Sequence, residues 1–260
     1  MTKRQSRTDE HKGRHALVTG GGTGLGRDIA LALARRGAEV TITGRDLARL
    51  EAMAEAEPGL HPLAMDVDDE ASVRTGIAEA AKARGPVAIC VANAGIAEAA
   101  PFGKETLAHW QAIMRTNLDG VFLTLQAAMA TLAPGDWGRM IAMSSIAGVR
   151  GLRNGPAYTA SKHGVIGLIR ACSEEHIGGT VTFNALCPGY VDTPIVERNA
   201  AEIAARQGIS EDEARAYLAR GNRHKTLLEV EEITGAAMWL CSDASRSVNG
   251  QCIEISGGQV

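Results

Sequence analysis

The sequence lacks several features that would point to particular partners or compartments. Its 260 residues contain no block of like charge, no apolar run long enough to cross a bilayer and no Cys-x-x-Cys pair. A net charge of −3 without a basic patch argues against nucleic acid or an anionic membrane as the main partner. The five cysteines are odd in number and come without metal-ligand spacing or a signal peptide. We therefore expect reduced thiols in a cytoplasmic protein that has no metal site.

What the sequence does contain is a regular alternation of two patterns. A hydrophobic fraction of 45% predicts a folded domain rather than disorder. Short apolar runs, expected to be strands, cover residues 15–19, 39–43, 61–65, 87–92, 138–144, 180–186 and 251–255. Alanine-rich amphipathic stretches, expected to be helices, cover residues 27–36, 46–56, 69–83, 105–132, 157–176 and 230–242. This alternation predicts an α/β fold with a Rossmann-type doubly wound parallel sheet, in one domain at residues 14–260 behind a flexible tail at residues 1–13.

A glycine-rich turn follows the first predicted strand. Residues 19–26 read Thr-Gly-Gly-Gly-Thr-Gly-Leu-Gly and lead into an amphipathic helix. Free backbone N–H groups at such a strand–turn–helix junction, together with the helix dipole, attract a phosphate. The glycines at 20, 24 and 26 depart from the usual Gly-x-Gly-x-x-Gly dinucleotide fingerprint, because residue 25 is leucine. The alternative interpretation is a flexible turn without a ligand.

A tyrosine and a lysine are spaced for shared chemistry in the second half of the chain. Tyr158 and Lys162 lie four residues apart, so on a helix the phenol and the ammonium share one face. A free phenol has a pKa of about 10, and a nearby ammonium would lower that pKa towards neutrality. Ser145, thirteen residues before the tyrosine, follows a predicted strand and is placed to hold a substrate oxygen against it. This triple predicts proton transfer to or from a substrate oxygen.

Taken together, these motifs resemble the short-chain dehydrogenase/reductase family, and the resemblance extends from about residue 13 to residue 258. The turn at residues 19–26 matches the family's Thr-Gly-x-x-x-Gly-x-Gly, and the thirteen-residue offset to the tyrosine selects Ser145 rather than Ser144 as its serine. The remaining matches are Asn93-Ala94-Gly95 (with Ala92 where a second asparagine is usual), Asn117 in a helix, and Pro188-Gly189 with Thr193 beyond.

The resemblance implies an NAD(P)-dependent oxidoreductase that interconverts a secondary alcohol and a ketone. It implies that Tyr158 exchanges the proton, that Lys162 also binds the nicotinamide ribose, and that Asn117 anchors a proton-relaying water. From the residues alone, Asn117 reads as a helix-interior asparagine bonded to neighbouring backbone. The implied cofactor contacts are Gly20, Thr23, Gly24, Leu25, Gly26, Arg45, Asp66, Val67, Asn93, Ala94, Gly95, Tyr158, Lys162, Pro188, Gly189, Val191 and Thr193. The family also usually forms tetramers through the helices that carry Asn117 and Tyr158, so we expect a homotetramer.

The end of the second predicted strand bears on the choice of cofactor. Sites that prefer NAD place an acidic residue there for the ribose hydroxyls, whereas this chain has Gly44 followed by Arg45. A guanidinium in that place can pair with a 2′-phosphate, so we favour NADP(H) over NAD(H). The alternatives are a solvated turn arginine at 45, with Asp46 as the N-cap of the next helix, and a helix cap rather than an adenine contact at Asp66.

A long segment at residues 194–229 is predicted to be a substrate lid. Ser210 and Glu213 form a capping box, which predicts a helix at residues 211–219. The segment is similar to the lids of D-3-hydroxybutyrate dehydrogenases, but the pocket departs from that subfamily. Where those enzymes hold the substrate carboxylate with polar residues, this chain has Ala97, Ala147 and Gly155, and Gln259 replaces a C-terminal aromatic. We therefore expect a bulkier 3-hydroxyacyl or 3-oxoacyl-type substrate, a thioester among the candidates, with a small hydroxy acid as the alternative.

Two basic groups are candidates to recognise a substrate anion. They are the pair Arg150 and Arg153, and the cluster Arg223-His224-Lys225; the alternative at both places is a solvated surface charge. His109, His163 and His176 show no paired carboxylate pattern and are expected to be structural.

Two other classes of protein share parts of this pattern. A cofactor-binding sensor would use the dinucleotide site but would not need Ser145, Tyr158 and Lys162 together. An epimerase or dehydratase of the related extended family would carry a larger C-terminal domain than the roughly seventy residues that follow Pro188.

Overall fold

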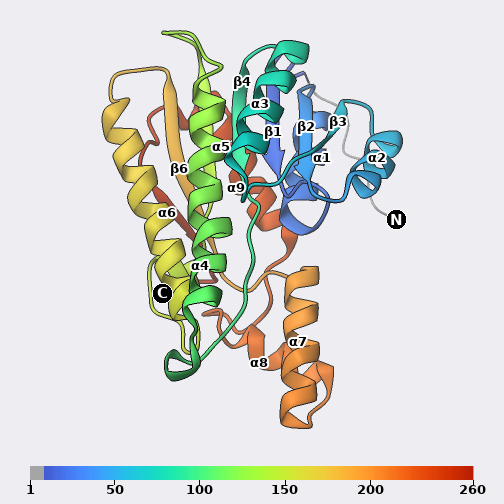
Figure 1. The fold of residues 1–260 in the computed structure, drawn as a ribbon, viewed down its shortest axis with the longest axis vertical. Coiled ribbons are helices and arrows are strands. Elements are labelled where there is room, and N and C mark those ends of the chain that lie inside the picture. Colours follow the sequence, from blue (N-terminus) through green and yellow to red (C-terminus); the bar gives the residue numbers. More distant parts are fainter. Residues whose placement is uncertain (1–8, 260) are drawn as a thin grey trace.

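Seven short apolar runs form one parallel sheet in the computed structural model, which describes residues 9–259. The strands are β1 (His15–Thr19), β2 (Glu39–Gly44), β3 (Leu60–Ala64), β4 (Val87–Ala92), β5 (Gly138–Met143), β6 (Val181–Pro188) and β7 (Cys252–Ile255). They lie in the order β3-β2-β1-β4-β5-β6-β7, so the winding reverses between β1 and β4 (Figure 1). The predicted doubly wound sheet is confirmed, and every strand boundary falls within two residues of its expected position.

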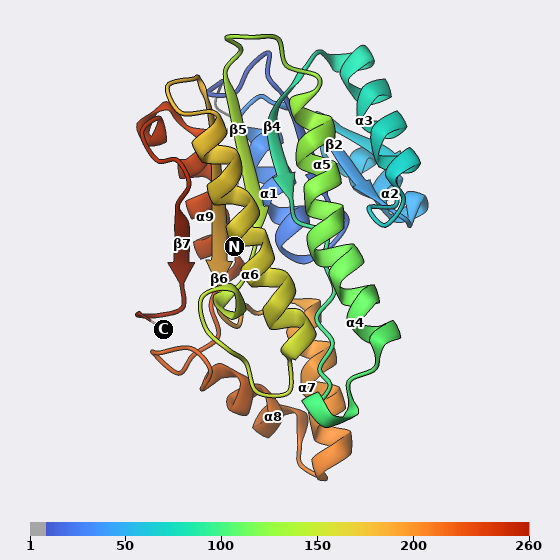
Figure 2. The same cartoon turned by 60° about the vertical axis from the view of Figure 1, so that its left-hand side comes forward.

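Helices cover both faces of this sheet. On one face α1 (Gly24–Arg35) packs beside α9 (Val230–Cys241), and α2 (Leu47–Ala56) lies next to β3 at the edge. On the other face lie α3 (Glu70–Arg84), α4 (Leu107–Met114), α5 (Gly120–Met129) and α6 (Pro156–Glu175), as Figures 1 and 2 show. The three layers follow from strands that are buried on both faces, as parallel sheets require.

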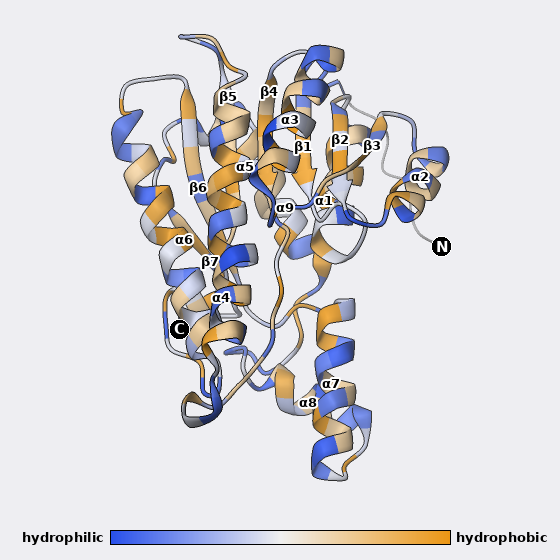
Figure 3. Cartoon of the chain, viewed as in Figure 1, coloured by the Kyte–Doolittle hydropathy of each residue, from blue (hydrophilic) through white to orange (hydrophobic). Residues whose placement is uncertain are grey.

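The central strand β1 illustrates how the two halves of the core are built. Ala16 and Val18 point into a cluster formed with α1 and α9, whereas Leu17 points into a cluster formed with α3, α5 and α6. All three side chains are fully buried, because successive residues of a strand face opposite sides of the sheet. Figure 3 shows the same concentration of apolar residues in the strands. Among residues 9–259, no helix combines the length and the hydropathy needed to span a bilayer.

Two predicted elements differ from the structure. The helix expected at 105–132 is helical from 107 to 129, but a π-helical segment, η2 (Arg115–Asp119), interrupts it between α4 and α5. The tail expected at 1–13 ends earlier, because the backbone N–H of His11 donates to the Arg36 carbonyl (2.8 Å) and the His11 side chain is fully buried. Residues 9–13 therefore belong to the folded domain, and residues 1–8 lie outside the described residues.

Two helices extend from the sheet below the ends of the strands (Figure 1). They are α7 (Pro194–Gln207) and α8 (Glu211–Ala219), and both lie in the segment predicted as a lid. The predicted helix at 211–219 and its capping box are confirmed, since Ser210 Oγ accepts from the Glu213 N–H and the Glu213 carboxylate accepts from the Ser210 N–H. The two helices pack on each other through a small core of their own, formed by Val196, Ala200, Ala204, Ala214 and Leu218.

Candidate active site

In the glycine turn, the backbone lies closer to neighbouring atoms than a residue with a side chain would permit. Gly20 has a φ of +63°, in the left-handed region. A Cβ on Gly26 would lie 2.4 Å from the Gly20 carbonyl oxygen, so no other residue fits there. α1 begins at Gly24, and Thr23 makes no side-chain cap hydrogen bond to it. The first N–H groups of α1 are thus left for an external acceptor, which fits a dinucleotide phosphate.

Asn93 supports this turn from the neighbouring strand. Its Nδ2 donates to the Thr19 carbonyl at 2.9 Å, while Thr19 Oγ1 accepts from the N–H groups of Asn93 (2.9 Å) and Ala94 (3.0 Å). The side chain that the resemblance places among the cofactor contacts is therefore engaged in joining the ends of β1 and β4. Thr19 is a supporting residue that the sequence reasoning missed, although it stands first in the glycine motif.

Tyr158 and Lys162 lie in α6, one turn apart as predicted. Lys162 is 4% exposed, its Nζ donates to the Met143 carbonyl at 2.8 Å, and it lies 5.7 Å from the centroid of the Tyr158 ring. Burial lowers the pKa of Lys162 to about 8. This value still leaves most of the side chain charged at neutral pH.

The pKa of Tyr158 moves in the direction opposite to the one expected. Burial raises this pKa above its ordinary value although the residue is partly exposed; a hydrogen bond with Ser145 acts against the rise, and the charge of Tyr190 adds to it. Lys162, which the spacing predicts to lower this pKa, is not among the causes of the shift. A phenol in these surroundings stays protonated at neutral pH.

The two adjacent serines have different partners. Ser145 Oγ accepts from the Ala147 N–H (3.1 Å) at the start of a 3₁₀ turn, η3 (Ile146–Gly148), and hydrogen-bonds with Tyr158. Ser144 Oγ instead donates to the Lys162 carbonyl at 3.0 Å and is 2% exposed. Ser144 thus fastens β5 to α6, and Ser145 is the serine that meets the tyrosine.

Asn117 lies in the π-helical segment and is fully buried. Its Oδ1 accepts from the Ile96 N–H (2.8 Å), and its Nδ2 donates to the Ile96 carbonyl (2.9 Å) and to Ser161 Oγ (3.3 Å). A Cβ on Gly95 would lie 3.1 Å from Asn117 Oδ1 and 3.6 Å from Lys162 Nζ. The asparagine therefore bonds to distant backbone rather than to its own helix, on the same side of Gly95 as the lysine. Irregular helical segments of this kind are frequent at functional sites.

The residues after β2 form the adenosine side of the predicted cofactor site. Arg45 is exposed and makes no ion pair within the described chain, and Asp46 caps α2 by accepting from the Arg49 N–H (3.2 Å), as predicted. Arg49 was missed by the sequence reasoning: its Cδ lies 3.5 Å from the position of a Cβ on Gly22, in the glycine turn. Its only sequence signal is its place in the first turn of the helix that follows β2.

Of the two residues after β3, Asp66 is half-buried and Val67 is buried. The helix-cap alternative for Asp66 is wrong, because α3 is capped by Asp69, whose carboxylate accepts from the N–H groups of Ala71 and Ser72. Asp66 Oδ1 accepts instead from the Asp68 N–H at 3.1 Å. Val67 is 8% exposed, and a Cβ on Gly120 in α5 would lie 3.1 Å from it.

The Pro-Gly motif is held by a residue that the sequence reasoning missed. Asn222, 1% exposed, accepts from the Tyr190 N–H (2.8 Å) and donates to the Tyr190 carbonyl (2.8 Å) and the Thr226 carbonyl (2.7 Å). A Cβ on Gly189 would lie 2.1 Å from Asn222 Oδ1, so this approach requires glycine. Val191 also forms an isolated β-bridge with Leu228. The two ends of the predicted lid are therefore joined at its base.

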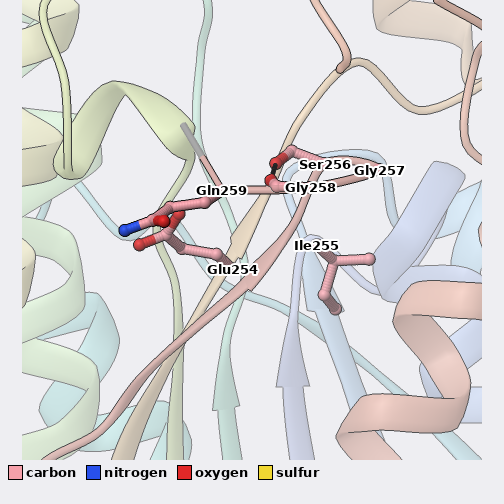
Figure 4. A pocket seen from close by; sticks show the side chains of 6 residues that line it. All are labelled: Glu254, Ile255, Ser256, Gly257, Gly258 and Gln259. Carbon is pink, nitrogen blue, oxygen red and sulfur yellow. Dashed lines mark hydrogen bonds between the residues drawn. The ribbon is translucent and has the colours of Figure 1, made fainter. Parts of the chain in front are cut away.

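The basic cluster at 223–225 packs against the C-terminal residues. Arg223 Nε donates to the Gln259 carbonyl (2.7 Å), and a Cβ on Gly257 would lie 2.4 Å from the His224 ring. Ser256, which stands where an aspartate is common, donates from its Oγ to the Gly258 carbonyl (2.7 Å). A depression of about 430 Å³ adjoins this cluster and is lined by residues 254–259, none of which is a predicted catalytic residue. Figure 4 shows the side chains of these residues.

One histidine differs from its expected surroundings. His109, at the start of α4, contacts two carboxylates: its Nδ1 pairs with Glu105 one turn earlier, and its Nε2 lies 3.4 Å from Glu98. The prediction that His109 has no paired carboxylate is therefore wrong, since the Glu105–His109 spacing of four residues was present in the sequence. These contacts connect α4 to the loop that follows β4.

Comparison with known proteins agrees with this geometry. The model of the short chain dehydrogenase family matches residues 14–204. The D-beta-hydroxybutyrate dehydrogenase of Cupriavidus necator is 33% identical over 254 residues, which cover 95% of this chain and 98% of that protein. The acetoacetyl-CoA reductase of Shinella zoogloeoides is 32% identical over 248 residues, which cover 95% and 98%. A crystal structure of a variant actinorhodin polyketide ketoreductase with NADPH superposes with a TM-score of 0.89 and 26% identity, covering 99% of this chain and 98% of that one.

Proposed function

This chain belongs to the short-chain dehydrogenase/reductase family, and from that membership we propose that it interconverts a secondary alcohol and a ketone of the 3-hydroxyacyl and 3-oxoacyl type. It is an NAD(P)-dependent oxidoreductase that acts on hydroxy or keto substrates. The observation that carries the proposal is that Ser145, just after the carboxyl end of β5, lies beside Tyr158 and Lys162 in the first two turns of α6. The glycine turn beside them leaves backbone N–H groups free for a phosphate.

The proposed reduction begins with a protonated tyrosine. The raised pKa of Tyr158 keeps its phenol ready to donate to the carbonyl oxygen of a ketone. Ser145 Oγ, already within hydrogen-bonding reach of that phenol, would hold the same oxygen in place. Bound NAD(P)H supplies the hydride to the carbonyl carbon. In the alcohol oxidation the phenolate accepts the proton back.

Lys162 stabilises the phenolate that forms when Tyr158 gives up its proton. Its ammonium is buried and held 5.7 Å from the phenol ring by the Met143 carbonyl, so its charge acts in a medium of low polarity. Asn117 and Gly95 lie on the path from Lys162 towards the loop after β4. We assign to Asn117 the anchoring of a water that returns the proton from solvent.

NADP(H) is the preferred cofactor in this proposal. β2 ends at Gly44, so the position where NAD-preferring sites carry a carboxylate has no side chain, and the nearby Asp46 carboxylate is paired with Arg49. Arg45 is exposed and free of ion pairs within residues 9–259, and the Arg49 side chain reaches the glycine turn at Gly22. Two guanidinium groups on this side of the turn support a doubly charged phosphate better than the ribose hydroxyls of NAD.

An acyl substrate larger than a free hydroxy acid is supported by the pocket and by the relatives. Ala97, Ala147 and Gly155 carry no polar group for a small carboxylate. One relative is named an acetoacetyl-CoA reductase and a structural neighbour a polyketide ketoreductase, and both names denote reduction of a keto group in a substrate other than a free hydroxy acid. The similarity to D-beta-hydroxybutyrate dehydrogenase keeps the small hydroxy acid as the second candidate.

The proposal is tested by following absorbance at the nicotinamide band. The purified enzyme is incubated with NADPH or NADH and with 3-oxoacyl thioesters, 3-oxo esters, cyclic ketones or, for the reverse reaction, free 3-hydroxy acids. The proposal expects the highest kcat/KM for a 3-oxoacyl thioester or ester with NADPH. Faster turnover of free 3-hydroxy acids would replace it with the second candidate. Tight cofactor binding without turnover of any class would favour a cofactor sensor.

We also propose a homotetramer assembled through the face formed by α4, α5 and α6. Phe122 in α5 is 42% exposed on that side of the sheet, which supports a covered surface there. Light scattering of the purified protein tests this, and a monomer would contradict it.

A further inference from the structure

Arg150 occupies an unusual electrostatic position beside the proposed active site. It follows η3 in the loop that joins β5 to α6, and its Nη2 donates to the Gly221 carbonyl at 2.9 Å. Figure 2 shows this loop next to the segment that follows α8. Within residues 9–259 its guanidinium forms no ion pair, and its Nε is buried without an acceptor. The arginine is therefore held in place by one backbone carbonyl and lacks a counter-charge.

A partly buried guanidinium without a counter-charge or a full set of acceptors destabilises the folded protein unless a ligand supplies them. A buried donor without a partner destabilises the fold, and it does so more strongly when the group is charged. Arg150 is only partly exposed, so water satisfies it incompletely. The neighbouring Arg153 in the same loop is exposed and has no such constraint. The solvated-charge interpretation therefore fits Arg153 and does not fit Arg150.

Tyr190 connects this arginine to the reacting groups. Its backbone is fixed on both sides by Asn222, and its ring lies against Gly221, where a Cβ would come within 2.2 Å of Cε2. Arg150 and Tyr190 thus touch the same residue. Burial raises the pKa of the Tyr190 phenol, the charge of Arg150 acts against that rise, and Tyr190 in turn raises the pKa of Tyr158. The Tyr190 hydroxyl makes no hydrogen bond within the described chain, so it too is a free donor.

On the basis of the function proposed above, we propose that Arg150 and Tyr190 recognise an oxyanion of the substrate, at a position between the predicted lid and Tyr158. An oxyanion there would supply the missing counter-charge to Arg150 and accept from the Tyr190 hydroxyl. It would also compensate for the apolar residues at 97, 147 and 155, which cannot bind a carboxylate. Two sources share this chemistry: the free carboxylate of a 3-oxo acid and a phosphate of a coenzyme A thioester.

The test compares three substrates that share one acyl chain: the 3-oxo acid, its coenzyme A thioester and its neutral ethyl ester. Their kcat/KM values are measured with NADPH for the wild type, Arg150→Gln and Tyr190→Phe, with Arg153→Gln as the matched control. We expect Arg150→Gln to lower kcat/KM about ten- to a hundredfold for one of the two anionic substrates and less than about twofold for the ester. Tyr190→Phe should act in the same direction, and Arg153→Gln should change none of the three.

The anionic substrate that responds identifies the source of the oxyanion. If Arg150→Gln lowered kcat/KM equally for all three substrates and also lowered the melting temperature, Arg150 would only hold the Gly221 backbone in place, and the assignment would be overturned. Unchanged kcat/KM for every substrate would overturn it as well. If the wild type reduces the ester but Arg150→Gln shows no selectivity, only the oxyanion site fails. If the wild type reduces none of the three, the proposed function fails together with the site that depends on it.

Discussion

Lys162 Nζ donates a hydrogen bond to the carbonyl oxygen of Met143, the last residue of β5, at 2.8 Å. This contact fixes the direction of the only ammonium that lies beside Tyr158 in the described chain. It joins the second turn of α6 to the strand end that also presents Ser145. The fold therefore fixes the position of the lysine. Because the side chain is only 4% exposed, its charge lowers the stability of the folded state.

The buried charge of Lys162 predicts that replacing the lysine with an apolar residue raises the free energy of unfolding by an amount that depends on pH. The folded-state pKa of Lys162 is about 8, below its ordinary value near 10.5, so the unfolded chain binds more protons between these limits. The penalty is full below pH 8 and disappears as the pH rises towards 10.5. Lys162→Met should therefore raise the free energy of unfolding at pH 7 by about 1–3 kcal/mol and by less at pH 10, while abolishing turnover.

Urea denaturation of both proteins at pH 7 and pH 10 measures this difference. Lys104→Met, at an exposed lysine, serves as the control and should show no such dependence. A Lys162→Met protein that is equally destabilised at both pH values would mean that the bond to Met143 outweighs the cost of burial.

Gly26→Ala tests the close approach within the glycine turn. A Cβ would lie 2.4 Å from the Gly20 carbonyl oxygen and 2.5 Å from Asn93 Nδ2, so the turn must open. We expect NADPH affinity to fall at least about tenfold, because the phosphate-binding N–H groups move with the turn. Fluorescence titration with NADPH measures this, and Gly103→Ala, where a Cβ meets no atom within 4 Å, is the control. Unchanged affinity would show that the cofactor does not use this turn.

Arg45→Ala and Arg49→Ala test the cofactor preference. Each should reduce kcat/KM for NADPH by about ten- to a hundredfold and leave kcat/KM for NADH within about twofold, since only the 2′-phosphate loses a charged hydrogen bond. Steady-state kinetics with both cofactors gives the ratio. Arg206→Ala, at an exposed arginine of α7, is the control. If both variants keep the wild-type NADPH/NADH ratio, the arginines do not select the cofactor.

Asn222→Ala tests how the base of the predicted lid is joined. The substitution leaves the backbone N–H of Tyr190 without a partner, whereas the Tyr190 carbonyl still accepts from the Leu228 N–H, so we expect a loss of about 1–3 kcal/mol in the free energy of unfolding. KM for the ketone should rise because Tyr190 and the segment after α8 are no longer held together. Asn199→Ala, in α7, should change neither quantity. A stable Asn222→Ala enzyme with normal KM would contradict the bracing role.

The strands and the order of the motifs were readable from the sequence because they depend on local pattern. Apolar runs such as 87–92 and the capping box at Ser210 need only neighbouring residues to define them. Asn222 and Thr19 could not be assigned a role, since each acts through hydrogen bonds to backbone far away in the chain. The pKa of Tyr158 was predicted in the wrong direction, because spacing reports which groups are near but not how deeply they are buried or what else they bond. Arg150 was left between two interpretations for the same reason.

The central claim is that Tyr158 exchanges the proton with the substrate oxygen, and Tyr158→Phe tests it most directly. The change removes one oxygen and leaves the ring in α6. With the best ketone found in the absorbance assay, kcat should fall about a hundred- to ten-thousandfold, while NADPH affinity stays within about twofold of the wild type. Tyr217→Phe, at a tyrosine that is 56% exposed, should leave both unchanged. A Tyr158→Phe enzyme with near-normal kcat would contradict the account.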